Sequence, residues 1–249
     1  AQLYVSSGTP ENKTTNAAGY IQFDKKALSI LNLSGGLRYE YFKTNSMQPI
    51  ARPIFRAGLS AHVLKGSWLR MSYGEGFRYP TIAERFISTK AGLFGIFPNP
   101  GIEPETSKNF EVGLRQGFKI GGCMGYVDVA GFSQHYHNTI EYLFGSWDTS
   151  VALFGFKFVN TGESRVNGAD ISLVLSTPES NKYFGVTAMA GYTYVLPESL
   201  SPDLVYAQTK PLFGFNDTLK TYKNSSMDTT GNILKYRFRH MIKADVELR

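Results

Sequence analysis

The sequence of 249 residues contains little cysteine and lacks several common motifs of enzymes. Its single cysteine, Cys123, excludes an internal disulfide and a zinc cluster built on cysteines. It contains no Gly-x-Ser-x-Gly elbow, no His-Glu-x-x-His motif and no glycine loop that could hold a phosphate. We therefore expect no enzyme activity, no catalytic residue and no bound cofactor.

Charge is also sparse. Charged residues make up 18% of the chain, and the net charge of +6 is spread along it rather than gathered into a basic patch. Nucleic-acid binding needs such a patch, so we expect no nucleic-acid partner. No stretch of about 18 apolar residues occurs, which excludes a transmembrane helix. Strands that cross a membrane stay possible, because they give a much weaker hydropathy signal.

The most informative pattern that is present is an alternation with period two. Leu59, Ala61 and Val63 alternate with Ser60 and His62. The same alternation returns at 31–41, 184–194 and 242–248. Side chains of a strand point to opposite faces in turn, so each segment reads as a strand between an apolar and an aqueous environment. Leu33, Leu59, Val186 and Val246 are predicted to face lipid, and Arg38, Arg56, Thr187 and Asp245 are predicted to face a lumen.

Nine strands are predicted, near 17–25, 28–42, 54–64, 67–77, 108–119, 122–141, 155–176, 182–196 and 234–249. Tight turns are predicted near Lys26, at Lys65-Gly66, at Ile120-Gly121 and at Pro178–Asn181. They alternate with long connections at 43–53, 78–107, 142–154 and 197–233. Outer-membrane β-barrels show this parity, whereas a Greek-key sandwich has no reason to keep it. We expect 78–107 and 197–233 to lie on the cell surface.

Aromatic residues gather where the predicted strands meet the long connections, as in the aromatic girdles of membrane barrels. They are Tyr39, Tyr41, Phe55, Tyr73, Phe110, Tyr192, Tyr194, Tyr236 and Phe238. The charged positions would line the inside. They are Arg38, Glu40, Arg56, Arg70, Glu111, Arg115, Asp170, Lys243 and Asp245. Burying so many charges unpaired costs several kcal/mol each, so the lumen must be wide and wet or filled by polar protein.

Several motifs support a family resemblance. They are Leu69-Arg-Met-Ser-Tyr-Gly-Glu-Gly-Phe-Arg-Tyr-Pro80, Ala83-Glu84, Asn99-Pro100, Glu103-Pro-Glu105, Glu111-Val-Gly113, Asn160-Thr-Gly162 and Gly168-Ala-Asp170. With the flanking segments 33–40 and 234–240, they closely resemble the barrel of TonB-dependent outer-membrane receptors. The family usually has Glu where Asp170 stands, which keeps the charge. The sequences Phe77-Arg-Tyr-Pro80 and Tyr236-Arg-Phe-Arg-His240 are most similar to the corresponding sequences in receptors of Bacteroidetes.

The resemblance implies an antiparallel barrel of about 22 strands that encloses an N-terminal plug. Residues 1–249 would then be a partial barrel domain, without the plug and the closing strands. Such receptors import siderophores, haem, cobalamin or glycans with energy from the TonB complex, which acts through the plug. The implied partners are that complex, a small-molecule or oligosaccharide ligand, outer-membrane lipid and, for a glycan receptor, a surface lipoprotein. The alternatives are a passive porin-like channel, a barrel enzyme and a soluble β-sandwich binding module.

Four charged residues are candidate contacts for the ligand or the plug, namely Arg78, Glu84, Arg38 and Arg56. An alternative for Arg78 is an ion pair with Glu84 or Glu105 that pins the base of the long connection, and we favour this alternative.

His135-Tyr-His137 places two imidazoles on one strand face, a spacing that can hold a metal. No third ligand is evident nearby in the sequence. We therefore expect no metal site there and interpret the two histidines as a pair in the lumen or at the rim of the barrel.

Overall fold

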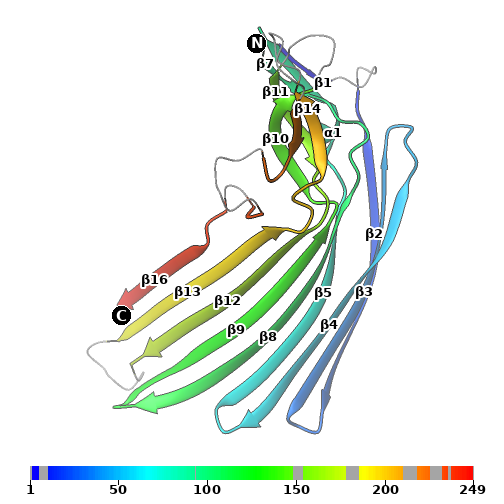
Figure 1. The fold of residues 1–249 in the computed structure, drawn as a ribbon. Helices are drawn as coiled ribbons and strands as arrows, with labels where there is room; N and C mark the ends of the chain where they lie inside the picture. The colour runs from blue at the N-terminus through cyan, green and yellow to red at the C-terminus, as the bar shows by residue number, and fades with distance from the viewer. Residues whose placement is uncertain are drawn as a thin grey trace.

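The computed structural model describes residues 2–5, 11–92, 94–147, 154–177, 185–209, 218–224, 232–234 and 237–248. Most of them form one antiparallel sheet of nine strands, the long strands of Figure 1. These strands are β2 (Thr14–Ala27), β3 (Leu31–Thr44), β4 (Ile50–Leu64), β5 (Ser67–Arg78), β8 (Glu105–Ile120), β9 (Cys123–His137), β12 (Ser164–Ser176), β13 (Val186–Ser199) and β16 (His240–Leu248).

The order of strands in this sheet follows the order of the chain, β2-β3-β4-β5-β8-β9-β12-β13-β16. This up-and-down order confirms the predicted all-β class, and each of the nine strands overlaps one of the predicted strands. The sheet is open, with β2 and β16 as its edges, so the barrel does not close within these residues.

The tight turns join neighbouring strands at one end of the sheet. Lys65-Gly66 makes one of them, and Gly66 has a φ of 76°, a conformation that residues with a Cβ atom rarely adopt. The break predicted near Lys26 is wrong by a few residues. There β2 continues to Ala27, and Leu28 and Ser29 make the turn at φ values of 53° and 51°. The turn predicted at 178–181 lies outside the described residues.

The register of the ladder assigns the side chains to two faces. Leu33 pairs with Leu59, and Val186 pairs with Leu248, so the alternating apolar residues share one face, here called the apolar face. The opposite face, here called the polar face, carries every charged residue that was predicted to line a lumen. The predicted opposition is confirmed for Leu33, Leu59, Val186 and Val246 against Arg38, Arg56, Thr187 and Asp245.

The apolar face is uncovered in the described part of the chain. Phe55, Leu114 and Val129 are 48%, 47% and 43% exposed. Near the long connections the same face carries the predicted aromatic residues, apart from Tyr236, which lies outside the described residues, and Phe238, which precedes β16. They are Tyr39, Tyr41, Phe55, Tyr73, Phe110, Tyr192 and Tyr194. Such a continuous apolar surface with an aromatic border suits contact with lipid better than contact with water.

Three predicted strand bounds need correction. The strand predicted at 122–141 ends at His137, because Asn138 takes a left-handed φ of 55°. The strand predicted at 155–176 is two strands in different sheets, separated near Gly162, whose φ is 86°. The strand predicted from 234 begins only at His240. Asn and Gly tolerate positive φ well, so both residues allow the strand to end there.

The long connections contain structure of their own at the other end of the large sheet, at the top of Figure 1. A five-stranded sheet has the order β1-β6-β7-β11-β10, and β14 pairs with β15. The elements are β1 (Gln2–Val5), α1 (Ile82–Phe86), β6 (Ile87–Ala91), β7 (Phe94–Phe97), β10 (Ile140–Ser146), β11 (Phe154–Asn160), β14 (Val205–Thr209) and β15 (Thr218–Thr221). Residues 78–107 were predicted as a plain connection and instead hold α1, β6 and β7. Within the described ranges, no helix is long and apolar enough to cross a membrane.

The assignment of faces predicts losses of stability of different size for two neighbouring substitutions in β4 of the full-length receptor. Leu59→Arg places a charge on the apolar face and should cost about 2–4 kcal/mol of unfolding free energy near a bilayer midplane. Ser60→Glu, on the polar face and opposite Arg70, should cost far less. Urea unfolding of the receptor in lipid vesicles measures both values. A larger loss for Ser60→Glu would show that the faces are reversed.

Candidate functional site

The base of the 78–107 connection is held by charged groups around Arg78, the last residue of β5. Its Nη1 lies 2.6 Å from Glu84 Oε1, and its Nε lies 3.6 Å from Glu105 Oε1. The structure thus shows the ion pair that we favoured for Arg78, with both predicted partners at once. A contact of Arg78 or Glu84 with a ligand or a plug stays a prediction.

Glu84 also caps the short helix α1. Its carboxylate accepts hydrogen bonds from the Thr81 backbone N–H at 2.8 Å and from Thr81 Oγ1 at 3.0 Å, while Thr81 Oγ1 accepts from the Glu84 N–H at 3.2 Å. This reciprocal capping box satisfies amide groups that a helix start leaves open. Burial acts to raise the pKa of Glu84, but the hydrogen bonds from Arg78 and Thr81 outweigh it and hold the pKa below its ordinary value.

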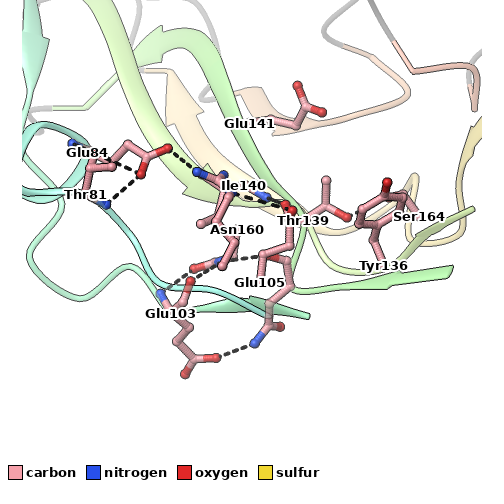
Figure 2. A network of polar contacts seen from close by, with 12 residues as sticks. Thr81, Glu84, Glu103, Glu105, Tyr136, Thr139, Ile140, Glu141, Asn160 and Ser164 are labelled. Atoms are coloured by element: carbon pink, nitrogen blue, oxygen red, sulfur yellow. Dashed lines mark hydrogen bonds and ion pairs between the residues drawn. The ribbon is translucent and has the colours of Figure 1, made fainter. Parts of the chain in front are cut away.

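A second set of contacts ties this connection to the segment between β9 and β11 (Figure 2). Asn160 Oδ1 accepts from the Glu103 N–H at 2.9 Å, and Asn160 Nδ2 donates to the carbonyl oxygens of Glu103 at 3.1 Å and Asn138 at 2.9 Å. The Glu105 carboxylate accepts from the Ile140 N–H at 2.9 Å. Two long connections are therefore fastened to each other directly above the sheet.

Arg85 fills the inside of the same connection. Its side chain is buried, its Nη1 donates to the Pro100 carbonyl at 2.8 Å, and its guanidinium lies 4.9 Å from the centre of the Tyr79 ring. Asn99 Nδ2 donates to the Phe158 carbonyl at 2.8 Å. The sequence gave no sign that Arg85 is buried, because an arginine in a charged loop is usually exposed.

A pocket of about 580 Å³ opens beside Arg78 at the loop end of the polar face. Arg78, Glu105, Tyr136, Ser164 and Arg237 supply its polar wall. The apolar wall consists of Ile140, Val166, Val195, Pro197, Leu234, Phe238 and Met241. Such a mixture of apolar wall and a few polar groups can hold an amphipathic ligand or a polar segment of protein. The described lining residues can donate and accept hydrogen bonds and form ion pairs with a bound group.

The other two candidate arginines lie on the polar face but apart from this pocket. Arg38 pairs with Glu40 at 2.5 Å. Arg56 lies in a separate pocket of about 420 Å³ with Gln22 and Asn109, and no ion pair of Arg56 is found among the described residues. The structure therefore does not gather the four candidate residues into one site, and the ligand contacts predicted for Arg38 and Arg56 stay predictions.

The polar face also contains a charge cluster, and three of its four members were predicted to line the lumen. The buried Asp128 Oδ2 lies 2.5 Å from Arg70 Nη1 and 2.7 Å from Arg115 Nε. These residues belong to β9, β5 and β8, and Glu111 adds a 3.4 Å contact to Arg70. The cluster joins three neighbouring strands and is structural, because each charge is met by an opposite charge.

The two neighbouring histidines lie at the loop end of β9 on the side of the apolar face. His135 Nε2 and His137 Nδ1 each lie 3.3 Å from the carboxylate of Glu163. The sequence missed Glu163 because it is 26 residues away from His137. Within the described ranges, no group of three His, Cys, Asp or Glu side chains is arranged to hold a metal ion.

Comparison with known proteins gives consistent matches. The family model "TonB dependent receptor-like, beta-barrel" matches residues 2–247. The Hemoglobin and hemoglobin-haptoglobin-binding protein A of Haemophilus influenzae is 33% identical over 137 residues, which cover 51% of this chain and 12% of that protein. The Hemoglobin-haptoglobin-binding protein A of the same species is 25% identical over 201 residues, which cover 77% of this chain and 18% of that protein.

Solved structures share the fold. The hemophore receptor HasR of Serratia marcescens, in complex with its hemophore HasA and heme, matches with a TM-score of 0.63 and 17% identity over 75% of this chain and 34% of that one. The copper transporter OprC matches with a TM-score of 0.57 and 14% identity over 80% of this chain and 33% of that one. The chain thus spans a minor part of each of these proteins. The resemblance to receptors of Bacteroidetes stays a prediction.

The lowered pKa of Glu84 predicts a pH dependence for the loop base. A carboxylate with a folded-state pKa below its ordinary value of 4.5 adds stability above that value, and this stability is lost as the pH falls through the folded-state pKa. In the full-length receptor, hydrogen exchange of amides 81–90, corrected for the intrinsic rate, should therefore accelerate in this acid range.

Glu84→Gln should speed this exchange at neutral pH by a few-fold, which corresponds to about 0.2–1 kcal/mol for the lost ion pair, and should remove the acid dependence. Glu11→Gln is the matched control, because Glu11 pairs with Lys13 at an exposed site. The ion-pair account fails if Glu84→Gln keeps the acid dependence of the parent receptor.

Proposed function

The chain belongs to the family of TonB-dependent receptor β-barrels, and from this membership we propose that it forms part of an outer-membrane receptor for the energy-dependent uptake of haem. The family consists of receptors and transporters rather than enzymes, in agreement with the expected lack of catalytic groups. The observation that carries the choice of haem is the 33% identity to a protein named for binding hemoglobin. The solved structures that share the fold include a ferric enterobactin receptor, but at 13% identity this likeness shows the fold alone and does not favour a siderophore.

The geometry supports a division of roles between the faces. The apolar face meets lipid, and the polar face lines the path of the ligand. The long connections, fastened together by Glu103, Glu105 and Asn160, form the outer entrance beside the pocket at Arg78. Further strands of the same receptor pair with the open edges β2 and β16, and a plug occupies the interior.

In the proposed mechanism the described residues perform no covalent chemistry. The entrance captures the ligand, and TonB acts on the plug to open a route along the polar face. Arg56, for which the described residues supply no ion pair, is the lumen cation that we assign to contact with the plug or the ligand.

The uptake test uses the full-length receptor in a strain that lacks other haem receptors and cannot synthesise haem. Growth on haemin is expected, and deletion of the TonB gene should abolish it because plug displacement needs energy. A ferric siderophore supplied to an iron-starved strain without other iron receptors is the control ligand. Growth on haemin without TonB would favour the passive channel. Growth on the siderophore alone would replace haem as the substrate.

A further inference from the structure

The five-stranded sheet of the long connections presents a row of aromatic rings on one of its faces. The register places Tyr142 opposite Phe158, Phe144 opposite Phe156, and Phe156 beside Ile96. The rings also contact one another. The centroid of Tyr142 lies 4.8 Å from that of Phe156, and the centroid of Phe144 lies 5.2 Å from that of Phe156. We call this surface, made of Phe94, Ile96, Tyr142, Phe144, Phe156 and Phe158, the aromatic face.

The aromatic face is exposed although it is apolar. Phe94, Phe144, Phe156 and Tyr142 are 60%, 47%, 40% and 37% exposed. At about 150–250 Å² per aromatic side chain, these four rings leave roughly 350 Å² of ring surface open. A patch of this size equals the largest on many monomers, and such patches are often functional. It is also close to half of the roughly 800 Å² that one partner contributes to a protein interface of standard size.

No charged residue shares this face among the described residues of β6, β7, β10 and β11. Lys90, Glu141 and Lys157 all belong to the opposite face. A small anionic ligand needs a cation, so a face without charge does not suit it. The centres of protein interfaces, in contrast, are depleted in charge and enriched in aromatic residues. The composition of the aromatic face therefore fits a protein partner.

The opposite face of the same sheet is already occupied. Leu143 and Val159 pack with Tyr222 and Leu234 in a buried cluster. Trp147 lies against Gly145 and donates from Nε1 to the Gly155 carbonyl at 2.8 Å. A Cβ atom at Gly155 would come within 1.9 Å of the Gly95 carbonyl oxygen, so no side chain fits at this position. Among the described residues, the sheet is thus supported on one side and open on the other.

From these observations we propose that the aromatic face is the docking surface for the protein that carries the haem, a folded carrier of the hemoglobin class with an apolar contact patch. This inference rests on the proposed function, which places the long connections outside the cell. The aromatic face binds the carrier, and the pocket beside Arg78 receives the released ligand. The two surfaces therefore serve separate steps, and carrier binding can be lost without loss of the uptake of free haemin.

The test compares two variants of the full-length receptor on whole cells. Phe144→Ser with Phe156→Ser removes the centre of the aromatic face, and Phe94→Ser removes its most exposed ring and disturbs the fold least. Lys90→Ser, on the opposite face of the same sheet, is the matched control. Binding of labelled hemoglobin should weaken at least about tenfold in the double variant and measurably in Phe94→Ser, as for interface aromatic residues. Growth on free haemin should stay normal in all three.

Several outcomes overturn the proposal. Unchanged hemoglobin binding in both variants, with the receptor displayed and folded as judged by heat-modifiable gel mobility, excludes the aromatic face as the docking surface. Equal loss of hemoglobin binding and haemin growth assigns these rings to the ligand path instead. A change only in receptor self-association assigns the face to a second copy. A parent receptor that grows on haemin but does not bind hemoglobin keeps the proposed function and removes this inference, whereas failure with both ligands removes both.

Discussion

The constraint on which the structure depends is the continuous hydrogen-bond ladder from β2 to β16. In a bilayer no water can satisfy a backbone amide or carbonyl, so a chain that crosses it as strands must pair each strand with its neighbours. The same ladder fixes which side chains share a face. Leu33 stays beside Leu59, and Thr187 stays beside Glu247, only if the register holds from strand to strand. If one strand shifted by one residue against its neighbours, its charged side chains would face the lipid. The pattern of side chains therefore fixes the pairing of the backbone.

Charge pairing then decides which polar groups are available for function. Asp128 is neutralised by Arg70 and Arg115, and Arg78 is shared between Glu84 and Glu105. Removing one member of such a cluster leaves the others uncompensated, which costs more than the pair itself contributes. Many charged residues of the polar face and of the loop base therefore hold strands and connections in place.

The sequence predicted the large sheet well because its strands are long and each pairs with the next. It failed where a single residue with positive φ interrupts a strand, as at Asn138 and Gly162, because the pattern of apolar residues does not report φ. It also could not find contacts between distant segments, such as the parallel pairing of β7 with β11 or the contact of Glu163 with His135. Of the candidate site, the sequence predicted the ion pair of Arg78 with Glu84 or Glu105. The roles of Asn160 and Arg85 depend on how two connections fold onto each other, which no local pattern encodes.

The molecule exposes aromatic side chains on two surfaces, and their surroundings give them different physical meanings. On the apolar face of the barrel sheet, rings such as Phe55 and Tyr73 form a border beside aliphatic residues, and lipid accepts such a surface without demanding a fixed geometry. On the small sheet the rings of Tyr142 and Phe156 stack at 4.8 Å on strands anchored from behind by Trp147 and a closely packed glycine row. Rings held by packing from behind lose little conformational entropy on binding, which is an advantage for recognising a shaped protein surface. The packed support rather than hydrophobicity alone therefore separates the surface assigned to recognition from the surface assigned to the membrane.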